Sequence, residues 1–385
     1  MKTIYLLGAT GSIGEQTLDI IRAYPDDFKL IAISGYSNFH RICEITREFQ
    51  PRMVVVKDEA DKKRFSQMFP EVLVKYGREG LKQLATFQPQ DHSAYLVNAL
   101  VGMVGLEPTI EAIKIERDIL LANKETLVVG GHLIRQLRKK YACQLYPIDS
   151  EHNALWQLLK NEKKAGIKRL IITASGGSFR DLSREELKHV SLRDALNHPN
   201  WSMGSKITID SATMMNKGFE VIEACYLFDL ELDQVDTVIH KESMIHALVE
   251  YVDGTVLAHL ANPDMHMPIA YAMHYPSRMP SLIKPFDLMA INHLSFEPMD
   301  FKRYPCLKLA LDAYRTGGSM RVVLNAANEA AVSLFLKGQI SFLDIETIIE
   351  DAMHQHKVVK NPSLDDVYRI DQEIKDKIFL AYSEE

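Results

Sequence analysis

The densest group of chemically capable side chains lies in residues 209–220, which read Ile-Asp-Ser-Ala-Thr-Met-Met-Asn-Lys-Gly-Phe-Glu. Ser211, Asn216 and Lys217 could donate hydrogen bonds at a predicted helix entrance, where unpaired N–H groups already attract anions. Glu220 adds a carboxylate that could ligate a cation. The segment therefore suits a phosphorylated substrate that also chelates a metal ion.

The helix predicted after this segment has two different faces. Asn216, Glu220 and Glu223 follow one another at helical spacing, and an apolar stripe lies opposite them. A plain amphipathic helix with a solvated charged face would show the same pattern. The segment alone leaves both interpretations open.

A glycine-rich turn stands close to the N-terminus. Residues 8–14 read Gly-Ala-Thr-Gly-Ser-Ile-Gly, after the apolar run 4–7 and before apolar residues at helical spacing. This strand, turn and helix is typical of dinucleotide-binding proteins, whose glycines let the backbone approach a pyrophosphate. An ordinary turn between a strand and a helix is the alternative.

The next predicted strand, residues 30–33, is followed by Ser-Gly-Tyr-Ser-Asn at residues 34–38. An NAD-binding protein usually places an acidic residue near this point to bind the ribose diol. No carboxylate stands here, and a neutral loop would not repel a 2′-phosphate. The loop therefore favours NADP over NAD.

A second acidic group lies in residues 146–152, Tyr-Pro-Ile-Asp-Ser-Glu-His. If the chain stays extended there, Asp149 and Glu151 point to the same side. Together with Glu220 they would offer three hard oxygen ligands, which suit Mg²⁺ or Mn²⁺. Alternatively, Asp149 or Ser150 caps an acidic helix start.

The order of these motifs resembles that of the 1-deoxy-D-xylulose 5-phosphate reductoisomerase family. The resemblance runs along essentially the whole chain and rests on residues 8–14, 121–125, 149–152, 174–177, 198–204, 211–220 and 324–329. It implies an NADPH- and divalent-metal-dependent enzyme that makes 2-C-methyl-D-erythritol 4-phosphate in the non-mevalonate isoprenoid pathway. The family reaction is usually written as a retro-aldol and aldol rearrangement, followed by hydride transfer to the resulting aldehyde.

The resemblance also implies which residues bind the substrate and the metal. The implied metal ligands are Asp149, Glu151 and Glu220, and the implied phosphate-binding residues are Ser175, Ser211, Asn216 and Lys217. The implied contacts to the sugar, including the flap that covers it, are Lys124, Ser150, His198, Trp201 and Met203. The residues expected to take part in catalysis are Lys124, Asp149, Glu151, His198 and Glu220.

The cofactor residues follow from the same resemblance. The pyrophosphate loop is matched by Thr10, Gly11, Ser12 and Ile13. The adenosine ribose side is matched by Gly35, Tyr36, Ser37 and Asn38, and the nicotinamide side by Asn123, Glu125 and Gly204. Many family members carry a basic residue in the loop at 35–38, whereas this chain has Tyr36 and Ser37.

Two other functions compete with this one. A semialdehyde dehydrogenase would share the glycine turn but needs a nucleophile such as cysteine, and none of the four cysteines lies in an obvious catalytic motif. A non-enzymatic NADP-binding sensor would explain the first motif and leave the carboxylates and Lys217 without a task.

The composition limits the classes of binding partner that the sequence predicts. A net charge of −6 with 25% charged residues indicates neither a nucleic-acid-binding nor a membrane-binding surface. No apolar run approaches the roughly 20 residues of a membrane span, and the cysteines show no disulfide-like spacing. We expect a cytoplasmic protein with reduced thiols, and the family implies a homodimer.

The pattern of elements predicts an α/β fold with an added helical region. Strand-like runs alternate with helical patterns at residues 4–7, 30–33, 53–56, 95–99 and 119–122, which is typical of a Rossmann-like sheet. Later runs and a hairpin turn at Asp253-Gly254 predict a second sheet. The proline-rich residues 263–305 are predicted to be irregular. The predicted domains are an NADPH domain at 1–150, a catalytic and dimerisation domain at 151–275 with a flap at 195–205, a linker at 276–304 and a helical domain at 305–385.

Overall fold

The computed structural model describes residues 1–88, 93–201 and 203–382. The chain folds into two compact units. The first comprises Met1–Thr126, Ile134–Asn153 and Met265–Lys284, and the second comprises Leu127–Leu133, Ala154–Asp264 and Pro285–Glu385. The division into four segments that the sequence predicts stays a prediction.

The first unit is built on a seven-stranded sheet of order β4-β3-β2-β1-β5-β6-β7, in which all paired strands are parallel. Its strands are β1 (Lys2–Leu7), β2 (Phe28–Ser34), β3 (Met53–Val56), β4 (Leu73–Tyr76), β5 (Ala94–Asn98), β6 (Asp118–Leu121) and β7 (Leu145–Pro147). Nearly all residues of β1, β2 and β3 are buried, as expected of a parallel sheet covered on both faces.

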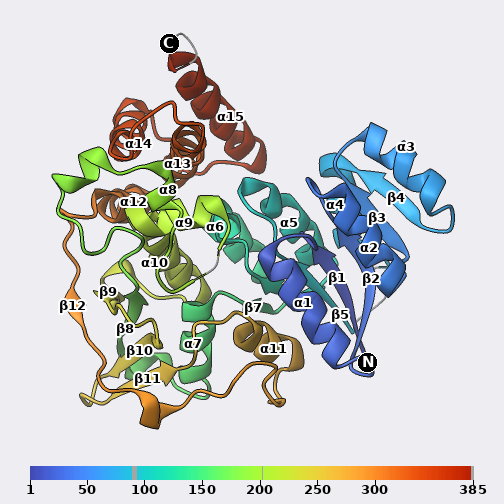
Figure 1. Ribbon diagram of the computed structural model, residues 1–385, viewed down its shortest axis with the longest axis horizontal. Coiled ribbons are helices and arrows are strands. Elements are labelled where there is room, and N and C mark those ends of the chain that lie inside the picture. Colours follow the sequence, from blue (N-terminus) through green and yellow to red (C-terminus); the bar gives the residue numbers. More distant parts are fainter. Residues whose placement is uncertain (89–92, 202, 383–385) are drawn as a thin grey trace. The chain divides into compact units, whose positions relative to one another are not determined.

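Helices connect these strands (Figure 1). They are α1 (Ser12–Ala23), α2 (Phe39–Phe49), α3 (Glu59–Met68), α4 (Gly77–Ala85), η1 (Met103–Gly105) and α5 (Leu106–Lys114). The unit also contains α11 (His266–His274), which comes later in the chain. Helix α1 packs against α11, and α4 packs against α5. Two further helices, α6 (Lys124–Arg138) and α7 (Ser150–Leu158), contain residues of both units.

The second unit contains a mixed five-stranded sheet of order β11-β10-β8-β9-β12. Its strands are β8 (Ile167–Ala174), β9 (Val235–Ile239), β10 (Ile245–Tyr251), β11 (Val256–Leu260) and β12 (Glu297–Pro298). Strands β8 and β9 are parallel, and the other pairs are antiparallel. The Asp253-Gly254 hairpin joins β10 to β11 as predicted.

Helices pack on this sheet and continue into the C-terminal part. They are η2 (Lys164–Gly166), η3 (Glu186–His189), α8 (Leu192–Ala195), α9 (Ser205–Thr213), α10 (Met215–Leu227), η4 (Leu232–Gln234), η5 (Leu288–Ala290), α12 (Pro305–Thr316), α13 (Met320–Leu336), α14 (Asp344–Gln355) and α15 (Leu364–Ala381). One face of the sheet packs with α10 in a core that includes Leu170, Val221 and Val249. Helix α13 packs against α14 and α15.

The predicted strands of both sheets are confirmed, with ends shifted by a few residues. The irregular structure expected for residues 263–305 is wrong in part, because residues 266–274 form α11. Pro268 lies in the first turn of that helix, where its missing N–H costs no hydrogen bond. Within 276–304, β12 pairs with β9. In the described part of the chain, no helix could cross a membrane. The four cysteines are buried and form no disulfide.

Candidate active site

The glycine turn between β1 and α1 leaves backbone donors at a helix N-terminus. Gly11 caps α1 without any side-chain hydrogen bond, so the first N–H groups, from Ser12 onward, have no capping partner. The turn follows β1, whose neighbours are β2 on one side and β5 on the other. Such a point of reversal in strand order is where open parallel sheets bind dinucleotides.

Gly14 is required by close packing of this turn. A Cβ atom built there would lie 2.2 Å from the Gly8 carbonyl oxygen, whereas one built at Gly11 would approach nothing closer than 3.5 Å. Gly14→Ala should therefore lower the free energy of unfolding by about 2–3 kcal/mol, as overpacking does. Gly11→Ala should cost about 0.5–1 kcal/mol, the effect of alanine at an N-cap. Urea unfolding of both variants checks this, and equal losses would contradict it.

The loop at residues 35–38 lies beside the glycine turn. The Ala9 N–H donates to the Ser34 carbonyl oxygen at 2.8 Å, and the Gly8 N–H donates to the Ser34 hydroxyl at 2.9 Å. Asn38 caps α2 by accepting the Arg41 N–H at 3.0 Å. The structure thus brings the predicted pyrophosphate and ribose residues to one edge of the sheet.

The residues predicted for the nicotinamide side in this unit form a buried network. Asn123 caps α6 by accepting the Thr126 N–H at 3.1 Å, and its amide donates to the Glu125 carboxylate at 2.9 Å. The same amide donates to the Leu100 and Gly102 carbonyl oxygens. Asn123 and Glu125 are therefore held rigidly at the carboxyl end of β6.

The acidic segment at residues 149–151 is a helix start. Strand β7 ends at Pro147 and α7 begins at Ser150, so the expected extended conformation of Asp149 and Glu151 is wrong. The alternative, an acidic helix start, is confirmed: the Asn153 N–H donates to the Asp149 carbonyl oxygen at 2.8 Å. Local helical hydrogen bonding overrides the alternation that a continuing strand would impose.

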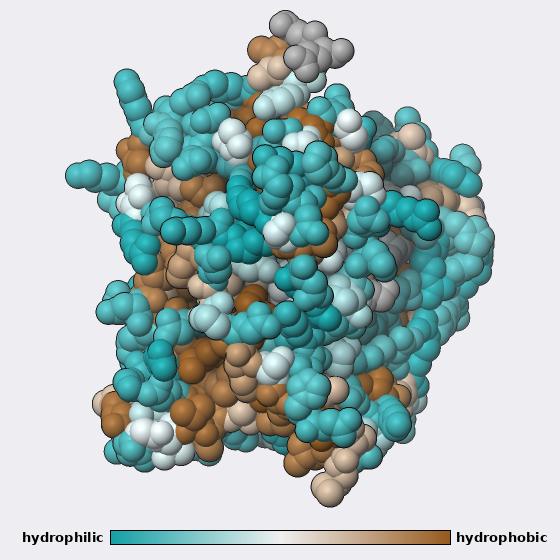
Figure 2. Space-filling view, turned by 60° about the vertical axis from the view of Figure 1, so that its left-hand side comes forward, coloured by the Kyte–Doolittle hydropathy of each residue, from teal (hydrophilic) through white to brown (hydrophobic). Residues whose placement is uncertain are grey.

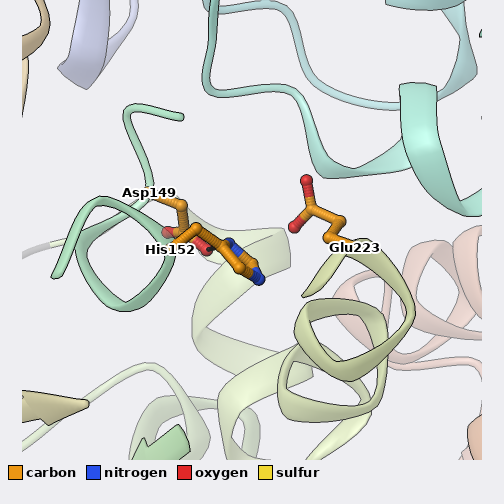
Figure 3. Close-up of side chains that lie close together, drawn as sticks. All are labelled: Asp149, His152 and Glu223. Carbon is orange, nitrogen blue, oxygen red and sulfur yellow. Dashed lines mark ion pairs between the residues drawn. The ribbon is translucent and has the colours of Figure 1, made fainter. Parts of the chain in front are cut away.

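Asp149 lies among two basic side chains of its own unit. Its Oδ2 is 2.9 Å from the Lys124 ammonium and 3.3 Å from Nδ1 of the fully buried His152. Figure 3 draws Asp149 and His152 at the start of α7, together with Glu223, which comes from α10. The Ser150 hydroxyl donates to the Glu151 carboxylate at 2.5 Å. The structure thus brings Lys124, Asp149 and His152 together.

This surrounding keeps Asp149 ionised. Burial alone would raise the pKa of its carboxyl, but the charge of Lys124 and the hydrogen bond with His152 outweigh burial and hold that pKa well below its usual value. A buried carboxylate that stays anionic at all working pH values is a suitable oxygen ligand for a hard cation.

The segment at residues 209–220 contains a break between two helices. Met214 has a φ of 64°, which ends α9 and starts α10. Ser211 therefore lies in the last turn of α9, not at a helix entrance, while Asn216 and Lys217 lie in the first turn of α10 as predicted. The alternative of a solvated charged face is wrong, because Lys217 and Glu220 are 4% and 1% exposed.

Glu220 is held by its neighbours on the same helix. The Asn216 amide donates to Glu220 Oε1 at 2.6 Å, and the Lys217 ammonium donates to Glu220 Oε2. These are the contacts expected at a spacing of four and three residues along a helix. Two side chains that were predicted to bind phosphate, those of Asn216 and Lys217, therefore donate hydrogen bonds to the predicted metal ligand Glu220.

His198 joins two predicted phosphate-binding hydroxyls. Its Nε2 lies 3.0 Å from the Ser175 hydroxyl and 3.3 Å from the Ser211 hydroxyl. Its Nδ1 accepts the N–H groups of Asn200 and Trp201, so in the neutral ring the proton is on Nε2. Because Nε2 donates to both oxygens, the two serine O–H groups are left to donate to a bound anion.

The loop that carries Ser175 is pressed against α9. A Cβ atom at Gly177 would lie 2.6 Å from Ala212 Cα, and the Gly177 N–H donates to the Ser175 hydroxyl at 3.2 Å. Arg180, which the sequence did not single out, donates to the Ser175 carbonyl oxygen at 3.4 Å and to the Lys241 carbonyl oxygen at 2.9 Å. The structure therefore brings Ser175, His198 and Ser211 together, although they are distant in sequence.

Burial controls the charge of His198. Loss of solvent, with a smaller contribution from the Arg180 guanidinium, lowers the pKa of His198 to about 4. As the pH falls from 7 towards 4, the unfolded chain binds a proton that the folded protein does not, so His198 should lower the free energy of unfolding in this window. Urea unfolding of the wild type and His198→Asn at several pH values checks this: the wild type should lose more stability on acidification, and parallel curves would contradict it.

The remaining flap residues flank His198. Trp201 lies 6.1 Å from the His246 ring, and Gly204 caps α9. Met203 is half-buried. Residue 202 of the predicted flap lies outside the described residues.

Asp210 and Asn328 form a connection that the sequence analysis missed. Asp210 is 3% exposed, and its carboxylate accepts from Lys206 at 2.9 Å and from the Asn328 amide of α13 at 2.8 Å. The 324–329 motif gave a signal, since it contains Asn328. Its companions Asn325 and Glu329 pair with each other at 3.1 Å, as expected of a structural role.

The candidate metal ligands of the described residues fall into two sets. Asp149, Glu151 and Glu220 each offer a carboxylate oxygen. Asp149 also belongs to the second set, with His152 and Glu223. The first set consists only of hard oxygen donors, which fits Mg²⁺ or Mn²⁺ better than zinc.

Three family models together match most of the chain. Residues 4–131 match the family model described as 1-deoxy-D-xylulose 5-phosphate reductoisomerase, residues 145–228 match its C-terminal domain model, and residues 260–377 match the DXP reductoisomerase C-terminal domain. A 1-deoxy-D-xylulose 5-phosphate reductoisomerase of Geobacillus sp. is 52% identical over 97% of this chain and 98% of its own length. The enzyme of Macrococcus caseolyticus is 51% identical over 98% and 99%.

Solved structures agree with these relatives. A DOX-P reductoisomerase in complex with NADPH, fosmidomycin and magnesium has a TM-score of 0.94, with 39% identity over 100% of this chain and 98% of that one. The Zymomonas mobilis enzyme in complex with NADPH has a TM-score of 0.91, with 36% identity over 99% of both chains. The family models match most of the chain and relatives of more than 50% identity span nearly all of it, so the chain belongs to the 1-deoxy-D-xylulose 5-phosphate reductoisomerase family.

Proposed function

We propose that this protein converts 1-deoxy-D-xylulose 5-phosphate to 2-C-methyl-D-erythritol 4-phosphate, using NADPH and a divalent cation, in the non-mevalonate isoprenoid pathway. The observation that carries the proposal is the meeting of Ser175, His198 and Ser211 at one point, with their hydrogen atoms arranged to receive an anion. The family membership supplies the identity of the sugar phosphate and the reaction.

The phosphate group would be bound by neutral and charged donors of the second unit. The hydroxyls of Ser175 and Ser211 donate to its oxygens, and Asn216 and Lys217 add an amide and an ammonium from the start of α10. Held at this remote end, the substrate is fixed for reaction at its other carbons, because binding energy is used to orient it. Trp201 and Met203 would cover the sugar, and closure of their flap would exclude water.

The metal ion would be held by Asp149, Glu151 and Glu220. The residues fit the group, since Asp149 is kept anionic and Glu220 is a buried carboxylate held in place by two donors. When bound, the cation supplies Lewis-acid polarisation of neighbouring sugar oxygens, and NADPH supplies the hydride. Lys124 and Ser150 would orient the sugar hydroxyls, and the Lys124 ammonium is also able to donate a proton to an oxygen that gains negative charge.

The cofactor would lie along the carboxyl edge of the parallel sheet. Thr10, Gly11, Ser12 and Ile13 would bind the pyrophosphate through the uncapped start of α1. The ribose would contact the residues Gly35, Tyr36, Ser37 and Asn38. The nicotinamide would contact Asn123, Glu125 and Gly204.

An absorbance assay at 340 nm tests this function against its two rivals. The purified protein, incubated with NADPH, Mg²⁺ or Mn²⁺ and 1-deoxy-D-xylulose 5-phosphate, should oxidise NADPH only when metal and sugar are both present. A sensor would bind NADPH without oxidising it. A semialdehyde dehydrogenase would act through a reactive thiol, yet all four cysteines are buried and burial raises the pKa of Cys143 to about 12. Absence of metal-dependent oxidation would reject the proposal.

The assembly expected is a homodimer. Strand β11 forms an edge of the second sheet and exposes Val256 and Leu257. Val252, which directly follows β10, is also exposed. Figure 2 shows hydrophobic side chains gathered toward the lower part of the face it draws. An edge strand with apolar side chains is suited to pair with a second copy. Sedimentation equilibrium should give twice the chain mass, and Val256→Lys should lower it. A monomer at micromolar concentration would contradict this.

A cytoplasmic location completes the proposal. It is supported by the four cysteines, none of which forms a disulfide, because reduced thiols persist in reducing compartments. Fractionation of cells that express the protein should recover it with cytoplasmic markers.

A further inference from the structure

Lys57 stands beside the loop at residues 35–38, although it belongs to a different part of the sequence. It directly follows β3, whose Val55 pairs with Ser34 of β2 and accepts the Gly35 N–H at 3.0 Å. The ammonium of Lys57 lies 5.5 Å from the centre of the Tyr36 ring. This distance is within the range of a cation–π contact.

Other charged side chains near the loop are already compensated. The Arg41 guanidinium binds Glu15 at 2.6 and 2.7 Å and Glu44 at 2.8 Å. His40 lies 3.2 Å from the same Glu44. The carboxylates of Glu15 and Glu44 are therefore already paired with the basic side chains in the first turn of α2.

Lys57 differs from them. Within residues 1–88 and the other described parts of the chain, its exposed ammonium has no carboxylate partner. The neighbouring Asp58 is turned to α3, where its carboxylate caps the helix by accepting the Asp61 N–H at 2.9 Å. An uncompensated cation thus stands next to a loop that contains no acid.

We propose that Lys57 recognises the 2′-phosphate of NADPH and makes the protein prefer NADPH to NADH. The inference rests on the proposed function, because it needs the adenosine ribose to lie at the carboxyl end of β2, where such sheets bind it. The ammonium supplies the charge-assisted contact that a 2′-phosphate requires and that a 2′-hydroxyl does not. The Tyr36 ring limits the side chain's freedom and so lowers the entropy lost on binding.

The position explains how the chain tolerates Tyr36 and Ser37 where a basic residue was expected from the family. The cation comes from the strand next to the loop instead of from the loop itself. Parallel pairing of β2 with β3 makes residues 34–36 and 55–57 neighbours in space. The positive charge that the loop after β2 does not carry is supplied by Lys57, in the loop after β3.

Cofactor binding tests the inference without turnover. NADPH and NADH are titrated into the wild type and Lys57→Ala, and the enhancement of nicotinamide fluorescence is followed. Lys57→Ala should weaken NADPH binding about five- to tenfold and leave NADH binding within about twofold, as expected for one partly exposed ion pair. Lys57→Glu should weaken NADPH binding further. Calorimetry with 2′,5′-ADP and 5′-ADP should give the same discrimination.

Lys63→Ala is the matched control. It removes one positive charge from an exposed position of α3 in the same unit, where Lys63 pairs with Glu59, and it should leave both affinities unchanged. If Lys57→Ala keeps the wild-type ratio of NADPH to NADH affinity, or if Lys63→Ala changes it equally, the inference is overturned while the proposed function stands. If the wild type binds neither cofactor, the proposed function itself fails.

Discussion

Glu220→Gln should lower turnover at saturating metal by roughly 100-fold or more. The substitution keeps the size of the side chain but removes the negative charge from a predicted ligand. Residues that merely support a ligand already cost about 10- to 100-fold in metal affinity or activity when they are changed. The loss should exceed this because Glu220 is proposed to contact the cation itself.

A titration with Mg²⁺ and Mn²⁺ measures this effect, as the metal concentration at half-maximal rate should rise along with the loss of rate. Glu223→Gln is the matched comparison, because Glu223 lies one turn further along α10 and belongs to the second candidate ligand set. If Asp149, Glu151 and Glu220 hold the cation, Glu223→Gln should lower turnover less than Glu220→Gln. Equal metal dependence in Glu220→Gln and the wild type would disprove the ligand assignment.

Lys217→Met should raise the Michaelis constant for the sugar phosphate by roughly 10- to 100-fold, in keeping with the loss of one or two charge-assisted hydrogen bonds. Methionine retains the apolar stem in a position that is 4% exposed. The substitution also leaves Glu220 without its cationic partner, which is costly inside a protein. We therefore expect a lower free energy of unfolding as well.

Steady-state kinetics with varied sugar phosphate check the prediction, and urea unfolding establishes that the variant is folded under assay conditions. Lys206→Met is the matched control for stability, since Lys206 pairs with Asp210 of α9 and is only half-buried. A variant with the wild-type Michaelis constant and turnover would show that Lys217 does not bind the phosphate.

The first unit could be predicted closely from the sequence because its signals are local. Buried parallel strands are continuous apolar runs, and the glycine turn marks where α1 begins. Asp149 and Glu151 could be named as candidate metal ligands, but the conformation expected for them was wrong. Over three residues, the sequence at the end of a strand looks like the sequence at the start of a helix. Hydrogen bonds such as that from the Asn153 N–H to the Asp149 carbonyl oxygen decide between the two conformations.

The contacts within the second unit could not be derived from local patterns. Ser175, His198 and Ser211 meet because β8, the loop after α8 and α9 are brought together by the packing of the whole unit. Likewise, the burial of Glu220 depends on what covers α10, and helical periodicity cannot reveal a helix that is buried on its charged side as well. The local sequence singled out Ser211 and Glu220, whereas Ser175 and His198 were named in advance only by the resemblance to a known family.

The hydrogen bond from Asn328 to Asp210 ties α13 to α9, the helix that bears Ser211. A gene fragment that encodes the catalytic motifs but stops before residue 320 would leave a buried carboxylate without this donor, at a cost of about 1–3 kcal/mol. The presence of the motifs is therefore a poor guide to whether a shortened sequence encodes a working enzyme. A library of fragments chosen by these motifs alone would include inactive ones. Complementation assays of such fragments should be judged by whether they retain Asn328.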